Sequence, residues 1–349
     1  MLQTFSLENI NEFVSTRNGE TKLGECVQCI SDNKNIADEL NNSNAKFVII
    51  GVPEDIGVQM NYGNPGAHTA FIPALKALLN TQQNQFINGN EILILGYLDF
   101  LDDVVNFNPT DREKGNELVQ KIDNELSKWI RIISSSGKTP IVIGGGHNNA
   151  YGNIKGLSEA KNDAINVVNL DAHTDLRKLE ERHSGNGFSY ALKNGFLDKY
   201  FMFGLHENYT PQYIFEYIHD HINLEYNMYE EMEVYQTTSF KSELQRALNF
   251  VSEKSFGIEI DLDCIQYFPS SAMTPSGFTP QQTRQFINYF GKHENASYLH
   301  ICEGAPSVSN EKTATTQVGK FISYLITDFI KSKTKSLCTE STEVYYTGD

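Results

Sequence analysis

Short apolar runs rich in β-branched residues alternate with longer segments of helical periodicity along most of this 349-residue chain. Several runs are apolar throughout, which is typical of strands covered on both faces in a parallel sheet. Between them, Leu118, Ile122, Leu126, Trp129 and Ile133 form one apolar helical stripe. This alternation predicts a layered α/β fold with right-handed crossovers. The expected strands span 47–52, 92–95, 140–143, 165–170, 200–205, 256–262 and 298–302.

The alternating pattern occupies the middle of the chain and suggests one main domain. No internal repeat and no Pro- or Gly-rich linker divides it. Residues 1–45 are polar and poorly periodic, and we expect a helical extension over the core or a partly mobile segment. Residues 46–331 form the expected main domain, with a second apolar stripe through Val318, Ile322, Leu325 and Phe329. Residues 332–349 form a polar tail with a strand-like segment at 343–346.

Composition excludes several classes of partner. Lys and Arg number 28 against 44 Asp and Glu, a net charge of −16, which argues against nucleic acid or an anionic membrane as a partner. No apolar run of about 18 residues occurs, so no membrane-spanning helix is expected. The N-terminal segment lacks a basic stretch followed by an apolar one, and the five cysteines are too few, and odd in number, for a disulfide framework. These features predict a reducing, cytoplasmic location.

Histidine and carboxylate side chains stand immediately after four of the expected strands. Ligands of parallel α/β sheets bind outside the carboxyl ends of the strands, so these side chains should gather at one edge of the sheet. The residues are His147, preceded by three glycines at 144–146, then Asp171, His173 and Asp175, then Asp261 and Asp263, and finally Glu303.

The spacing of these residues predicts a metal centre. Alternate residues of an extended segment share one face, so Asp171, His173 and Asp175 point together, as do Asp261 and Asp263. Four converging carboxylates repel one another and raise one another's pKa values unless cations lie among them. Two divalent ions balance four carboxylates, and carboxylate with imidazole suits Mn²⁺. A single Asp or His at the end of a strand is more often a helix cap or a turn residue than a metal ligand. The presence of all three motifs at the ends of expected parallel strands favours the metal site.

The chain contains, in this order, the segments Gly-Gly-Gly-His147, Asp171-Ala-His173-Thr-Asp175 and Asp261-Leu-Asp263. These segments resemble the three metal-binding signatures of the ureohydrolase family, which contains arginase, agmatinase and formimidoylglutamase. The resemblance covers about residues 46–330. It implies a three-layer α/β/α sandwich around a mainly parallel sheet, two Mn²⁺ per subunit, and a homo-oligomer, either a trimer or a hexamer. It also implies the ligand sets: His147, Asp171, Asp175 and Asp261 for one ion, and Asp171, His173, Asp261 and Asp263 for the other, with Asp171 and Asp261 bridging.

The resemblance further implies catalytic roles for two residues. His183 resembles a loop histidine proposed to carry a proton, and Glu303 resembles the glutamate that grips an amidine or guanidine. Asp175, beside the expected metals, is a third catalytic candidate: it would orient the attacking water, and either Asp175 or His183 would protonate the leaving amine. The chain also departs from the family pattern. Gln266 and Tyr267 stand where an Asp-Pro pair is frequent, Ala305 where Asn is usual, and Asn64 where Arg is frequent. None of these is a metal ligand, so the departures concern substrate geometry and rate.

Within the family, the sequence is most similar to formimidoylglutamases, because Asp175-Leu176-Arg177 and the segment 51–67 resemble that branch. The implied reaction converts N-formimidoyl-L-glutamate and water to L-glutamate and formamide, in histidine degradation. That small-molecule substrate carries two carboxylates and needs cationic partners, for which Arg177, Arg182 and His206 are candidates. Glu180 shares the loop, so a mixed-charge solvated loop is the alternative reading of the two arginines.

Two other functions remain open from the residues alone. The first is hydrolysis of a guanidino substrate, as in arginase or agmatinase. The second is a metal-binding scaffold without catalysis, which the changed surroundings at Gln266 and Ala305 keep open.

Overall fold

The computed structural model describes residues 1–31, 34–308 and 312–342. Within these residues, ten strands form one sheet in the order β1-β4-β3-β5-β10-β9-β6-β7-β8, and β2 pairs with β4 beside this path. Every pair is parallel except β1 with β4. The strands are β1 (Leu2–Thr4), β2 (Gln28–Cys29), β3 (Phe47–Gly51), β4 (Ile92–Leu98), β5 (Thr139–Ile143), β6 (Ile165–Leu170), β7 (Leu197–Leu205), β8 (Leu224–Met228), β9 (Phe256–Asp261) and β10 (Ala296–Cys302).

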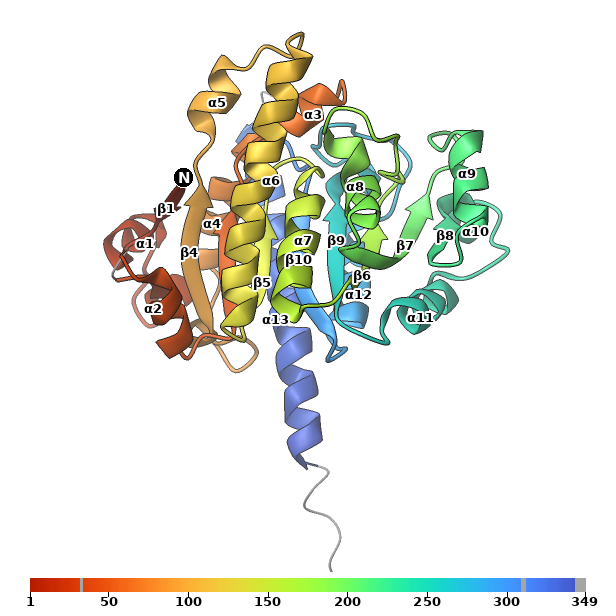
Figure 1. Ribbon diagram of the computed structural model, residues 1–349. Helices are drawn as coiled ribbons and strands as arrows, with labels where there is room; N and C mark the ends of the chain where they lie inside the picture. Colours follow the sequence, from red (N-terminus) through yellow and green to blue (C-terminus); the bar gives the residue numbers. More distant parts are fainter. Residues whose placement is uncertain (32–33, 309–311, 343–349) are drawn as a thin grey trace, which may run out of the picture.

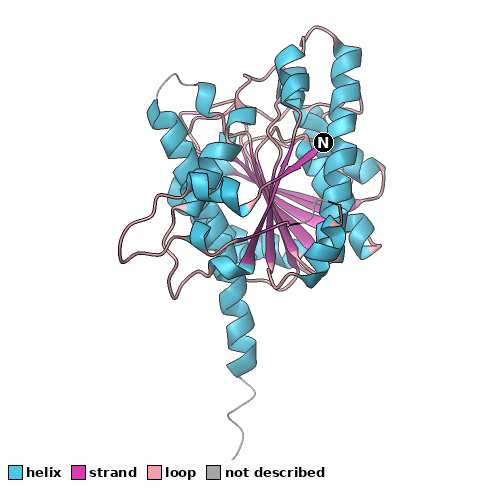
Figure 2. Cartoon of the chain, turned by 90° about the vertical axis from the view of Figure 1, so that its left-hand side faces the viewer, coloured by secondary structure: helices cyan, strands magenta, loops and turns pink. Residues whose placement is uncertain are grey.

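Helices cover both faces of the twisted sheet, so the molecule has three layers (Figures 1 and 2). One apolar core packs α6 and α7 against one face, and a second packs α4, α11, α12 and α13 against the other. The three-layer α/β/α prediction is therefore confirmed. The helices are α1 (Leu7–Phe13), α2 (Ile36–Asn42), α3 (Ile56–Met60), α4 (Phe71–Leu79), α5 (Leu101–Asn106), α6 (Arg112–Ser135), α7 (Asn149–Lys161), α8 (Gly187–Lys193), α9 (Gln212–His219), α10 (Tyr229–Glu233), α11 (Phe240–Val251), α12 (Pro280–Gly291) and α13 (Lys312–Thr342).

The central strands follow directly from their apolar runs. β3, β6 and β9 are buried at every position, as expected of strands with a helical layer on each face. The long helix α6 begins after Asp111, whose side chain accepts a hydrogen bond from the N–H of Lys114 at 3.0 Å. Its apolar stripe lies in the core on the α7 side. All seven expected strands are present.

The two ends of the chain differ from expectation. Residues 1–45 form not only the helices α1 and α2 but also β1 and β2, which extend the sheet beside β4. At the other end, α13 continues to Thr342 and projects from the body in Figure 1, so residues 332–342 of the expected tail are helical. The segment 343–346 lies outside the described residues, and the domain limits stay a prediction.

The described helices include none that is both long and apolar enough to cross a membrane. The described cysteines, Cys26, Cys29, Cys264 and Cys302, are free thiols.

Candidate metal centre and active site

A glycine turn after β5 brings His147 to the carboxyl edge of the sheet. Gly144 and Gly145 adopt φ values of +88° and +78°, which L-residues with a side chain rarely adopt. A Cβ on Gly145 would also lie 2.8 Å from the backbone carbonyl oxygen of Val52, so a side chain there would strain the turn. The buried carboxylate of Glu54 accepts hydrogen bonds from the N–H of Gly146 at 3.2 Å and from Nδ2 of Asn149 at 2.9 Å, which holds the turn in place.

The segment after β6 supplies three of the candidate ligands. Asp171 is fully buried, and its Oδ1 accepts the backbone N–H of His173 at 2.7 Å. Its Oδ2 accepts a hydrogen bond from Nδ2 of Asn169 at 3.0 Å. Asp175 has a left-handed backbone with φ +48°, a strained conformation that persists only where surrounding contacts impose it. The turn therefore presents Asp171 and Asp175 to one ligand group and His173 to the adjoining one.

The end of β9 supplies the other two carboxylates. Asp261 closes the strand, and its Oδ1 accepts the backbone N–H of Asp263 at 2.7 Å. The Asp263 carboxylate accepts hydrogen bonds from the N–H of Ala272 at 2.9 Å and from Oγ of Ser271 at 3.0 Å. Each carboxylate is thus fixed by backbone or hydroxyl donors, with no Lys or Arg among its described ion-pair partners.

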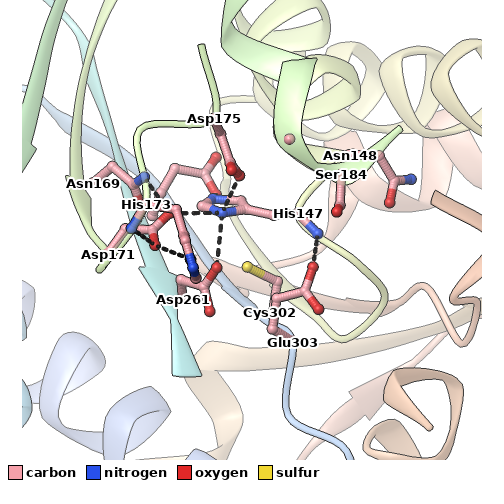
Figure 3. Close-up of polar contacts among 12 residues, drawn as sticks. His147, Asn148, Asn169, Asp171, His173, Asp175, Ser184, Asp261, Cys302 and Glu303 are labelled. Atoms are coloured by element: carbon pink, nitrogen blue, oxygen red, sulfur yellow. Dashed lines mark hydrogen bonds and ion pairs between the residues drawn. The ribbon is translucent and has the colours of Figure 1, made fainter. Parts of the chain in front are cut away.

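The structure brings His147, Asp171, Asp175 and Asp261 together (Figure 3). Nδ1 of His147 lies 2.9 Å from Oδ2 of Asp175 and 3.2 Å from Oδ2 of both Asp171 and Asp261. One potential ligand group therefore contains His147, Asp171, Asp175 and Asp261, with its ligand atoms within 4.8 Å of one another.

A second potential group adjoins the first. It contains His173, Asp261 and Asp263, again with ligand atoms within 4.8 Å of one another. Asp171 lies beside this group, with Oδ1 3.4 Å from Nδ1 of His173. Asp261 belongs to both groups, which is the arrangement a bridging ligand needs.

The charges of this cluster require compensation. Burial raises the pKa of Asp261 well above its usual value, and the neighbouring carboxylates of Asp171 and Asp263 raise it further. Burial also raises the pKa of Glu303, and the carboxylates of Asp263 and Asp261 add to that shift. Closely spaced oxygen donors with two imidazoles are a donor set that suits Mn²⁺, and two divalent ions would balance the four aspartates. The residues present therefore fit a binuclear manganese centre.

Glu303, which follows β10, lies beside this cluster. Its Oε1 accepts the backbone N–H of His147 at 2.6 Å, and its own N–H donates to the carbonyl oxygen of Gly145 at 3.0 Å. Its backbone has φ +61°, which turns the side chain away from the strand direction. Its other oxygen, Oε2, is buried without a hydrogen-bond partner among the described residues, which leaves an acceptor for a ligand in the site.

A cavity of about 620 Å³ opens onto the cluster. Its floor includes His173, Asp175 and Glu303, and Arg177 is the one Lys or Arg residue among the described residues that line it. Arg177 makes no ion pair with another described residue, so its guanidinium is available to an anionic group.

The phenol ring of Tyr209 forms a wall of the cavity that sequence reasoning missed. It stacks on His173, with 5.3 Å between ring centroids and 25° between planes. Tyr209 lies three residues after His206 beyond β7, so the rule that ligands bind at carboxyl strand ends could have identified it.

Two predicted substrate contacts lie elsewhere. The guanidinium of Arg182 is buried, with Nε 2.9 Å and Nη2 3.1 Å from the carboxylate oxygens of Asp123, and it does not line the cavity. His206 lies behind Tyr209, stacked between that ring and the ring of Tyr229. The prediction that Arg182 and His206 contact substrate is therefore not supported: one anchors the loop to α6, and the other packs against aromatic rings.

His183 is also buried away from the cavity. Its Nδ1 accepts the N–H of Gly185 at 3.1 Å, and its Nε2 lies 3.2 Å from Oε1 of Glu180. Burial lowers its pKa to about 4, so the imidazole is neutral at pH 7. In this structure it caps the loop that follows the metal ligands, and its expected role as a proton carrier stays a prediction.

The three departures from the family pattern lie outside the cavity lining. Asn64 donates a hydrogen bond from Nδ2 to the carbonyl oxygen of Ser271 at 2.9 Å. Gln266 is exposed, and Ala305 is buried, with its N–H donating to Pro269. None of them alters the candidate ligand groups.

Comparison with known proteins gives a consistent result. The arginase family matches residues 45–326 of this chain. A formimidoylglutamase of Streptococcus pyogenes serotype M12 is 26% identical over 295 residues, which cover 80% of this chain and 84% of that protein.

Solved structures share the fold. A crystal structure of a Trypanosoma cruzi formiminoglutamase variant with Mn²⁺ superposes with a TM-score of 0.70 at 19% identity, covering 90% of this chain and 98% of the other. The formimidoylglutamase of Bacillus subtilis gives a TM-score of 0.69 at 17% identity, covering 92% and 94%. At these identities the superpositions establish the fold.

Proposed function

This chain belongs to the arginase family, and we propose that it is a binuclear manganese hydrolase that converts N-formimidoyl-L-glutamate and water to L-glutamate and formamide. The Streptococcus pyogenes relative and the Bacillus subtilis structure described above both carry the name formimidoylglutamase. The observation that carries the choice of substrate is the position of Arg177, an unpaired cation on the wall of a cavity whose floor is acidic.

Arg177 favours a substrate with an anionic far end. The guanidinium binds carboxylates through charge-assisted hydrogen bonds, and formimidoylglutamate offers two carboxylates. Agmatine has no carboxylate and ends in a cation, which Arg177 would repel. Arginine has one carboxylate beside an ammonium group. The charge of the cavity wall therefore favours the formimidoyl substrate over both guanidino substrates.

The acidic floor suits the other end of the substrate. The free Oε2 of Glu303 is placed to accept an N–H of the planar amidinium, while Oε1 remains bound to the backbone of His147. Two Mn²⁺ ions held by the aspartates, His147 and His173 would lower the pKa of water in the site, so that water attacks the amidine carbon at neutral pH. Tyr209 lines one side of the cavity.

Asp175 is the residue best placed to handle the proton. It lines the cavity and belongs to the first potential ligand group. We propose that its carboxylate accepts the proton of the attacking water and then delivers it to the departing amine of glutamate, which must be protonated to leave. The oxygen of water is then found in formamide, and the C–N bond to glutamate is broken.

A substrate panel tests this proposal. Purified protein supplied with Mn²⁺ is assayed with formimidoylglutamate, arginine, agmatine and guanidino acids, and release of formamide or urea is measured. We expect formamide from formimidoylglutamate at a rate that exceeds urea release from the guanidino substrates. Faster urea release would assign a guanidino substrate instead, and manganese binding without any turnover would favour a scaffold.

The biological setting belongs to the same proposal. L-Glutamate formation from a formimidoyl donor is a step of histidine degradation, and we place the enzyme in the cytoplasm as a homo-oligomer, either a trimer or a hexamer. Residues 46–331 would form the catalytic domain.

A further inference from the structure

A row of buried polar side chains lies directly beneath the candidate metal ligands. Asn169 on β6, Glu259 on β9 and His300 on β10 are neighbours in the register of the parallel sheet, with Asn169 and His300 each opposite Glu259. All three are fully buried. Asn169 and Glu259 precede Asp171 and Asp261 by two positions, so each shares a sheet face with its ligand.

Glu259 is the centre of this row. Its Oε1 accepts a hydrogen bond from the phenol of Tyr298 at 2.7 Å, and its Oε2 lies 2.5 Å from Nδ1 of His300. Among the described residues, no Lys or Arg pairs with it. A buried carboxylate is costly unless polar partners stabilise it, so its place beneath the metal centre needs an explanation.

The second ring nitrogen of His147 points at this carboxylate. Nδ1 faces the three aspartates of the first ligand group, whereas Nε2 is buried without a hydrogen-bond partner. Oε2 of Glu259 lies 3.6 Å from that Nε2. A shift of about 0.6 Å would bring the two atoms to hydrogen-bond distance.

We propose that Glu259 is a positioning residue that orients His147 as a manganese ligand. A histidine that binds a metal through one nitrogen usually donates its other N–H to a carboxylate or carbonyl, which fixes the ring and raises ligand basicity. Glu259 provides that acceptor, and His300 and Tyr298 hold Glu259 in turn. The inference rests on the manganese centre of the proposed function and is independent of the substrate.

Manganese titration without substrate tests the inference. Metal-free wild type and Glu259→Gln are titrated with MnCl₂, and free Mn²⁺ is measured from its electron paramagnetic resonance signal. Glu243→Gln is the matched control, because Glu243 is a buried carboxylate that hydrogen-bonds Asn227 and Arg246 and does not line the cavity. We expect two Mn²⁺ per wild-type chain, affinity about 10- to 100-fold weaker in Glu259→Gln, and unchanged affinity in the control.

The other outcomes are equally informative. Wild-type affinity in Glu259→Gln would overturn the inference while leaving the manganese centre intact, whereas a wild type that binds no Mn²⁺ would overturn the proposed function as well. Three bound ions in the wild type would also overturn it, because His147, His300 and Cys302 would then form a metal site of their own.

A second variant covers the case in which Glu259→Gln fails to fold. Tyr298→Phe removes only the phenol that donates to Glu259. Losing this donor loosens the Glu259 carboxylate without removing it, so we expect manganese affinity to fall by less than in Glu259→Gln, about 5-fold. Unchanged affinity in this variant would overturn the inference.

Discussion

The backbone N–H of His147 donates a hydrogen bond to Oε1 of Glu303 at 2.6 Å, so the glycine turn after β5 and the residue after β10 are held together. β5 and β10 are neighbouring parallel strands, which explains why residues so distant in sequence meet at one edge. The metal-binding turn and the proposed substrate-holding carboxylate therefore form one rigid unit.

This contact makes Glu303→Gln informative. The amide oxygen can still accept the His147 N–H, but the charge that holds the amidinium is lost. A hydrogen bond to a charged group contributes about 1.5–3 kcal/mol, so we expect kcat/KM for formimidoylglutamate to fall about 10- to 150-fold. Manganese content should remain at the wild-type level. Steady-state formamide assays and metal analysis check both, and wild-type kinetics would exclude Glu303 from substrate binding.

Asp261 belongs to both potential ligand groups. Losing a residue that only hydrogen-bonds a metal ligand usually weakens metal affinity by up to about 100-fold. Losing Asp261 itself should weaken manganese affinity by more than this, and formamide release should disappear. Asp171→Ala should behave in the same way, because Asp171 belongs to the first group and lies 3.4 Å from His173 of the second. Plasma mass spectrometry counts the bound ions. An Asp261→Ala protein with two bound ions and full turnover would refute the binuclear scheme.

Arg177 should determine how tightly substrate binds. Arg177→Gln removes the one Lys or Arg side chain among the described residues that line the cavity. We expect KM for formimidoylglutamate to rise about 10- to 100-fold with little change in kcat, because the far carboxylate is bound equally in the ground and transition states. Lys178→Gln is the matched control, since Lys178 shares the loop but does not line this cavity. Equal effects of the two substitutions would indicate a general charge effect instead of a specific contact.

Arg182 should matter for stability rather than for substrate binding. Its guanidinium is buried against Asp123, and Arg182→Met would leave that carboxylate buried without a counter-charge. We expect the free energy of unfolding to fall by about 3–5 kcal/mol in urea titrations. The double variant Asp123→Asn/Arg182→Met should recover part of this loss. A raised KM with undiminished stability would instead restore Arg182 as a substrate contact.

His68 and Asp55 make the unfolding free energy depend on pH. The hydrogen bond that the His68 ring donates to the Asp55 carboxylate raises the pKa of His68 above its usual 6.5, although burial opposes the shift. A raised folded-state pKa means that the stabilisation is fully present below pH 6.5 and is lost as pH rises through the folded pKa. The stability difference between wild type and His68→Gln should therefore shrink from pH 6 to pH 9. A difference that is constant with pH would show that the pair does not titrate.

The buried strands could be predicted from the sequence, whereas the edge strands could not. β6 and β9 are apolar runs closed by aspartates, and the rule for carboxyl strand ends placed their ligands correctly in space. β1 and β2 are three and two residues long, too short for a periodic signal. β8, at the other edge, mixes buried and half-buried positions, so its sequence lacks a continuous apolar run.

The loop after the metal ligands shows where sequence reasoning stops. Arg177 and Arg182 lie five positions apart in one mixed-charge loop, yet one lines the cavity and the other is buried against Asp123 on α6. The local sequence around Arg177 and around Arg182 gives no sign of which one lines the cavity. Only the packing of the loop against α6 decides which guanidinium is free, and that contact joins segments about 60 residues apart.

The central claim is that four buried aspartates share the edge of the sheet because two manganese ions lie among them. Anomalous diffraction at the manganese edge, from crystals grown with excess Mn²⁺, tests this most directly. We predict two peaks, one in ligand contact with His147 and Asp175, the other with His173 and Asp263, and both with Asp261. A single peak, or no peak within ligand distance of these side chains, would contradict the account.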